Sequence, residues 1–259
     1  MRASWKGYFR VGDVMLPVKL YAATRSIGPH FIQLHAIDHS PVTRVTVCLQ
    51  DGEEINEDDI VRAAEYDGKY IELSEKELER STGFERNIVI RQFTDRADIN
   101  LIYYDSPYYL APDQGGELTY AILRRAFERT NKVAIATFLF YGRERLALVS
   151  LQDEIIIVQT LRFYDEILPG SDIKLPAIPQ PSPAQISIAS SLMERYSAPF
   201  YARDYRNQQQ DLIREVIEAK AKGLPVKKRE SIAPETTPAS QVSAKMKSML
   251  GEDPKALRA

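Results

Sequence analysis

Apolar and polar residues alternate along the first part of the chain, as is typical of strands with one buried face. The apolar positions of one parity are Trp5, Phe9 and Val11, and after Gly12-Asp13 they are Val14, Leu16, Val18 and Leu20. We therefore predict two strands joined by a turn at Gly12-Asp13. Pro17 cannot donate a ladder hydrogen bond, so it indicates a sheet edge or a bulge in the second strand.

Similar patterns predict further strands at 45–49, 70–73 and 87–93, and Ser74 with Glu77 forms a capping box that predicts a short helix after the second. The spacing of apolar residues then changes to that of a helix over 116–132. Three predicted strands follow at 133–141, 145–151 and 154–163. The first 168 residues are thus β-rich with one main helix, which indicates a β-rich α+β fold.

Prolines gather between 168 and 183 and indicate a boundary. Ser182, Pro183 and Gln185 then form the capping pattern of a helix, and a second helix is predicted over 204–222. We therefore divide the chain into a core of 1–168, a connection with a helical arm at 169–224, and a tail of 225–259. The tail is basic and poor in apolar residues, so we expect it to be disordered apart from a helical patch at 241–250.

Composition excludes several classes of protein. Of the 259 residues, 44% are apolar and 27% are charged, which is ordinary for a folded domain in water. The sequence contains no run of about 18 apolar residues, so no membrane span is predicted. The single cysteine, Cys48, indicates a reducing cytoplasm. The first 199 residues carry 22 basic and 28 acidic groups, whereas residues 200–259 carry 12 and 8, so the chain has a basic end.

Catalytic motifs are missing: the sequence has no GxSxG, HExxH, GxxxxGK[ST] or GxGxxG pattern. His35, Asp38 and His39 could bind a metal ion, but their spacing matches no established ligand set, and a polar loop is the favoured interpretation. Asp165 and Glu166 could hold magnesium in a nuclease. Neighbours in a strand point to opposite faces, so a solvated turn or salt bridge is favoured for this pair.

Several ordered segments together resemble the bacterial Ku end-joining proteins. The matching segments are 2–7, 16–24, 31–35 with Asp38, 51–55 with 58–61, 108–113, 164–166, and 205–220 with Gly223. Their order and spacing extend over some 220 residues, which makes the resemblance specific.

The resemblance implies a fold and a function. It implies a central β-barrel with an inserted bridge, dimerised into a ring that encircles DNA, with a helical C-terminal arm and a flexible tail. It also implies a non-catalytic protein that threads linear duplex ends, forms a homodimer, and recruits and stimulates an ATP-dependent DNA ligase in non-homologous end joining. No cofactor, metal or membrane is expected, and the place of action is the bacterial cytoplasm at the nucleoid.

Candidate binding residues follow by position. The bridge is expected at 42–79, which makes Arg44, Arg62 and Lys69 the first candidates for contact with DNA phosphates, followed by Lys19 and Arg25. The tail adds the basic cluster Lys227, Lys228 and Arg229. The apolar face of the helical patch, expected to dock in a partner's groove, is Val242, Met246, Met249 and Leu250.

Two other functions stay open on the sequence alone. One is a DNA-end protector that needs no ligase, like the phage Gam proteins that resemble Ku. The other, less favoured, is a metal-dependent nuclease that uses Asp165 and Glu166.

Overall fold

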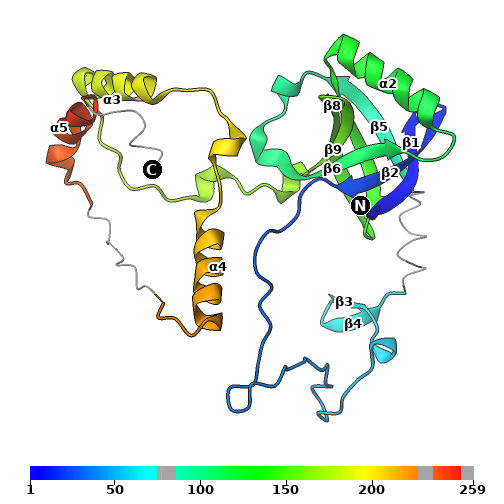
Figure 1. Ribbon diagram of the computed structural model, residues 1–259. Helices are drawn as coiled ribbons and strands as arrows, with labels where there is room; N and C mark the ends of the chain where they lie inside the picture. The colour runs from blue at the N-terminus through cyan, green and yellow to red at the C-terminus, as the bar shows by residue number, and fades with distance from the viewer. Residues whose placement is uncertain (75–76, 78–85, 227–235, 252–259) are drawn as a thin grey trace. The chain divides into compact units, whose positions relative to one another are not determined.

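Seven strands close into a barrel in the computed structural model (Figure 1), which describes residues 1–74, 77, 86–226 and 236–251. The strand order around the barrel is β1–β2–β6–β9–β8–β7–β5. The strands are β1 (Trp5–Val11), β2 (Val14–Ala22), β5 (Asn87–Thr94), β6 (Tyr104–Pro112), β7 (Val133–Phe140), β8 (Arg143–Gln152) and β9 (Ile155–Leu161). Neighbours are antiparallel except β1 and β5, which are parallel over the three pairs from Tyr8–Asn87 to Arg10–Val89.

Every second side chain along the strands points into the barrel and fills its interior. Phe9, Leu16, Val18 and Leu20 are buried, as the alternation of the first hairpin predicts. Phe138, Val149 and Val158 add the opposite wall, and each fully buried side chain of this kind stabilises the fold by roughly 1.5–3 kcal/mol. Trp5 lies edge-on to Phe138, and its indole N–H donates to the Leu139 carbonyl at 2.9 Å.

Helix α2 (Glu117–Thr130) packs on the barrel through Phe127, which is buried. Tyr120 fixes the helix to two strands, because its hydroxyl donates to the Leu110 carbonyl at 3.0 Å and accepts from the Ile156 amide at 3.1 Å. Asn131 in the left-handed conformation ends the helix.

A long segment, residues 23–86, is inserted between β2 and β5. It holds a 3₁₀ turn (Glu57–Asp59) and a two-stranded hairpin of β3 (Ala63–Tyr66) and β4 (Lys69–Glu72), which turns at Asp67-Gly68. None of its described residues is buried. We call residues 23–86 the insert.

The chain divides into two compact units, residues 1–26 with 32–172, and residues 27–31 with 173–259. The second unit contains α3 (Pro183–Tyr196), α4 (Gln208–Ala221) and α5 (Ala239–Met249). Short 3₁₀ turns complete the described structure: Arg96–Asp98, Leu101–Tyr103, Tyr164–Glu166, Gly170–Asp172 and Ala202–Asp204. Within the described residues, no helix is long and apolar enough to cross a membrane.

Most predicted elements are confirmed. These are the first hairpin, the strands at 70–73 and 87–93, the helix at 116–132, the three strands after it, and α3 with its Ser182 capping box. Pro17 fits because pairing between β2 and β6 begins only at Val18. The helix predicted over 204–222 begins later, since a 3₁₀ turn occupies 202–204 and Asn207 caps α4.

Two regions differ from prediction. The strand predicted at 45–49 is wrong: Val47 forms an isolated bridge with Glu54 around a turn at Gly52, and no described strand pairs with residues 45–49. Strand β6 was not predicted, because its tyrosines and prolines hide the alternation. The Ser74–Glu77 capping box is present, with the Glu77 amide donating to Ser74 Oγ at 3.3 Å, but the helix predicted after it lies mostly outside the described residues.

Candidate nucleic-acid interface

Four cations line a pocket of about 550 Å³ on the outside of the barrel. Its lining residues are Arg2, Ala3, Ser4, Trp5, Lys6, Lys19, Tyr21 and Arg86. We call this cavity the basic pocket. It lies where the insert leaves β2 and where it returns to β5, since Tyr21 and Arg86 are close to those two points.

The strand pattern places two of these cations, Lys6 and Lys19, on the outside of the barrel. Side chains alternate between faces along a strand, so Lys6 and Lys19 point away from the core that Phe9 and Leu20 fill. The hairpin register sets Lys6 directly opposite Lys19.

Gly7 brings Arg86 to the pocket. The Tyr8 amide donates to the Arg86 carbonyl at 2.9 Å. A Cβ atom on Gly7 would overlap that carbonyl and the Trp5 ring, so only glycine allows the chain to approach this closely.

The charges of the basic pocket are incompletely balanced. Like charges directly opposite each other on two strands are destabilising, so the Lys6–Lys19 pair needs a counter-charge. Asp113 supplies one, with its Oδ1 atom 2.5 Å from Lys19 Nζ. The hydrogen bond with Asp113 raises the pKa of Lys19. Hydrogen bonds from Lys19 and from the Gln114 amide, with the charge of Lys6, lower the pKa of Asp113.

One carboxylate against four cations leaves the basic pocket positive. Arg2, Lys6 and Arg86 have no ion pair among the described residues. A concave positive surface concentrates field lines and attracts anions, and phosphate groups are the anions that such clusters of Lys and Arg bind.

The predicted DNA contacts lie in different places. Lys19 belongs to the basic pocket and is paired with Asp113. Arg25, Arg44 and Arg62 lie exposed in the insert, and Lys69 is the exposed first residue of β4. The tail cluster Lys227, Lys228 and Arg229 lies outside the described residues.

The insert as a whole is acidic. Residues 23–86 contain seven Lys or Arg and fourteen Asp or Glu. The first 22 residues contain four basic residues and one acid, Asp13. The barrel hairpin therefore offers phosphates a more favourable field than the insert does.

Sequence reasoning missed three residues of the basic pocket: Arg2, Lys6 and Arg86. Lys6 could have been found, because it occupies the same polar face of the first predicted hairpin as the candidate Lys19. Arg86 could not, because its place depends on the parallel pairing of β1 with β5, which joins residues far apart in the sequence.

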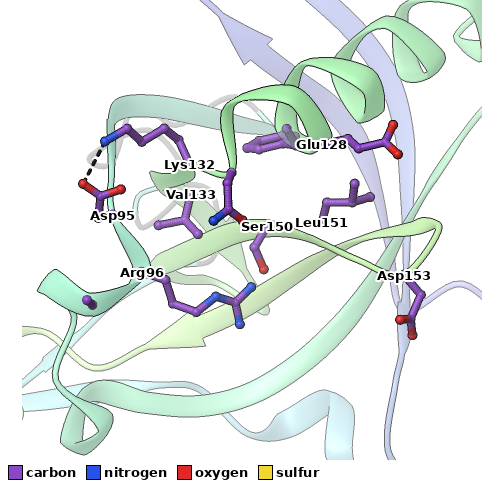
Figure 2. A pocket seen from close by; sticks show the side chains of 11 residues that line it. Asp95, Arg96, Glu128, Lys132, Val133, Ser150, Leu151 and Asp153 are labelled. Carbon is purple, nitrogen blue, oxygen red and sulfur yellow. Dashed lines mark hydrogen bonds and ion pairs between the residues drawn. The ribbon is translucent and has the colours of Figure 1, made fainter.

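A second cavity, of about 750 Å³, lies beside the end of α2 (Figure 2). Lys132 and Asp95 form an ion pair of 2.8 Å on one side, and Glu128 and Asp153 lie on the other (Figure 2). Its charged lining consists of three acids and the two cations Arg96 and Lys132, so it is not a phosphate site.

The residues considered for metal chemistry form turns. Asp38 accepts hydrogen bonds from the Ser40 amide at 3.0 Å and from the His35 ring at 2.9 Å, and His39 has a left-handed backbone. Glu166 accepts from the Phe163 amide at 2.7 Å, which turns its carboxylate back onto its own loop. No group of three metal-binding side chains occurs in the described part of the chain.

The apolar face predicted to bind a partner is half-buried against α3. Val242 and Met246 of α5 line a groove with residues of α3, and Met249 and Leu250 are half-buried too. The Met249 carbonyl accepts a hydrogen bond from the Tyr196 hydroxyl at 3.4 Å.

Comparison with known proteins gives a family match and many relatives. Residues 10–188 match the family model described as the Ku70/Ku80 beta-barrel domain. A protein of Archaeoglobus fulgidus named "Non-homologous end joining protein Ku" is 33% identical over 231 residues, which cover 86% of this chain and 89% of that protein.

Two further relatives carry the same printed name. The protein from Pseudomonas aeruginosa is 35% identical over 229 residues, covering 85% of this chain and 77% of that protein. The protein from Symbiobacterium thermophilum is 34% identical over 228 residues, which cover 87% of this chain but 57% of that longer protein.

Proposed function

The chain belongs to the Ku β-barrel family, and we propose that it binds the ends of broken double-stranded DNA in non-homologous end joining without catalysing a reaction. The observation that carries this proposal is the family match over residues 10–188, which covers most of the barrel and the beginning of the arm, with relatives named for end joining that align over most of this chain. The lack of nucleotide-binding and hydrolase motifs agrees with a non-catalytic role.

We further propose that two copies form a ring around the duplex. The insert supports this part, because it exposes large apolar side chains such as Ile37 (84% exposed) and Leu49 (101% exposed) that its own chain leaves uncovered. Exposed apolar surface of this kind marks an interaction site. A hairpin of two strands is also marginal in water by itself, so β3 and β4 gain stability from a second surface.

DNA contact is assigned to the basic pocket first and to the insert cations second. The pocket combines three cations that form no ion pair with any described residue and a fourth, Lys19, that is paired with Asp113. Contacts of this type go to the phosphate backbone and carry no sequence preference, as a protein that accepts any broken end requires.

Ligase recruitment is assigned to the tail, with the apolar face of α5 as the docking element. The basic cluster Lys227, Lys228 and Arg229 is assigned to additional attraction of DNA.

The test compares linear and relaxed circular duplexes of the same sequence in gel retardation. A closed ring loads only over an end, so we expect binding to blunt and overhanging linear DNA and very little to circles. Affinity should fall with salt as about 0.9 counterions are released per neutralised phosphate. Equal binding to circles contradicts the ring, and cleavage of labelled DNA with magnesium favours the nuclease.

A further inference from the structure

The apolar faces of α3 and α5 meet. On α3, the half-buried positions are Ile188, Ala189, Leu192 and Tyr196, which follow helical spacing. On α5, they are Val242, Ser243, Met246 and Met249, continuing to Leu250. The face of α5 that a partner would need is therefore covered by its own chain.

This contact is shallow. No residue of α3 is fully buried. A groove of about 520 Å³ remains between the two helices, lined by Ile186 and Met193 of α3 and by Met246 of α5. Between the described residues of the two helices, the Tyr196 hydroxyl donates a long hydrogen bond to the Met249 carbonyl at 3.4 Å. Helices as short as these are marginal alone, so α5 depends on whatever covers its face.

We propose that α3 and the ligase compete for the same face of α5, so that α3 acts as an internal competitor that limits recruitment. The proposal rests on the ligase recruitment proposed above. One apolar face cannot be buried twice, so the ligase binds only the fraction of molecules in which α5 has left α3. The measured affinity is lowered by that fraction.

Three single substitutions in the full chain test the competition. Leu192→Asp places a charge on the half-buried face of α3 and should release α5. Ala189→Leu adds apolar volume beside the groove with a good helix former and should hold α5 more tightly. Ser187→Asp is the control, because it adds the same charge at an exposed position on the other side of α3.

The readouts are hydrogen exchange of the α5 amides and affinity for the ligase. We expect Leu192→Asp to speed α5 exchange and to raise ligase affinity about 5-fold, a coupling of ordinary size. Ala189→Leu should slow exchange and lower affinity, and Ser187→Asp should change neither. Met246→Asp, which damages α5 itself, should speed exchange and abolish ligase binding.

The proposal requires that, among the α3 variants, faster hydrogen exchange of the α5 amides goes with higher affinity for the ligase. If Leu192→Asp speeds α5 exchange and ligase affinity stays equal or falls, the competition is wrong. If it leaves α5 exchange unchanged, α3 does not hold α5 and the proposal is overturned. A full-length chain that retards linear DNA but never binds the ligase refutes recruitment and the competition together, and leaves end binding standing.

Discussion

Lys6 is the residue at which the basic pocket is most sharply tested. It faces Lys19 across the hairpin and has no ion pair in the described structure. We expect Lys6→Glu to weaken binding to linear DNA and to flatten the slope of log affinity against log salt by about one unit, because one phosphate contact is lost. Measurement by fluorescence anisotropy at several salt concentrations is sufficient.

Arg129→Glu provides the matched control, because Arg129 is an exposed cation on α2, away from the basic pocket. It changes the net charge by the same amount. Equal loss of affinity and slope in both variants would mean that net charge, rather than the basic pocket, governs DNA binding.

Substitution of Asp113 should change the affinity for DNA in the opposite direction. Asp113→Asn keeps the size of the side chain and removes the acid that holds Lys19, so the basic pocket becomes more positive. We expect tighter binding to linear DNA and a steeper salt dependence. Unchanged binding would show that Lys19 and its neighbours do not contact phosphates.

The same ion pair has a pH signature. The pKa of Asp113 is lowered in the folded chain, so its stabilisation is present above the pKa of an unfolded aspartate and is lost as pH falls through the lower folded value. Acid unfolding followed by circular dichroism should therefore begin at higher pH in Asp113→Asn, which lacks this stabilisation at every pH.

At the level of elements, the β3–β4 hairpin gives a second test of DNA contact. Arg62 and Lys69 are exposed at the start of the hairpin and of β4. Arg62→Glu with Lys69→Glu should weaken end binding without changing the thermal unfolding of the barrel, since neither residue is buried. Because the insert is acidic, we expect a smaller loss than for Lys6→Glu with Lys19→Glu. A larger loss would move the main DNA contact to the insert.

The tail is tested by ending the chain at Pro225. Dimerisation and binding to linear DNA should remain largely intact, while stimulation of the ligase should fall. Met246→Asp with Leu250→Asp is the finer comparison, because it removes the apolar face and keeps Lys227, Lys228 and Arg229. Full stimulation by the shortened chain would move recruitment to the folded body.

Local patterns predicted the elements that bury one face in the barrel. Phe9, Leu16 and Leu20 alternate because the barrel interior takes every second side chain. The same rule failed at 45–49, where alternating valines lie in the insert and pair with no strand of the described structure. Alternation reports the potential to bury a face, and whether a second surface arrives depends on the rest of the molecule.

The candidate site was only partly predictable for a related reason. Lys19 was among the candidates, but its partner Asp113 follows β6, a strand that the pattern did not show. Arg86 reaches the pocket through a parallel pairing between distant segments. Phosphate sites of this kind are assembled by topology and have no local motif.

At the scale of the whole molecule, the proposed ring requires two copies. We expect light scattering at micromolar concentration to give twice the 29.5 kDa chain mass, with an interface above about 2,000 Å² if the dimer is obligate. Such an interface would be isologous, with the same patch used on both subunits. A stable monomer that still binds linear DNA but not circles would contradict this arrangement.

The barrel is closed by strands that lie far apart in the sequence, and this has a consequence for how the chain folds during synthesis. Residues 1–22 leave the ribosome as a hairpin whose Phe9, Leu16 and Leu20 have no core to enter. The missing walls arrive only when synthesis reaches Leu161, the end of β9. At about 5–20 residues per second, the wait is on the order of 10 s. During that interval the apolar side of the hairpin is a target for chaperones and for other nascent copies, so slower translation should increase aggregation of this protein.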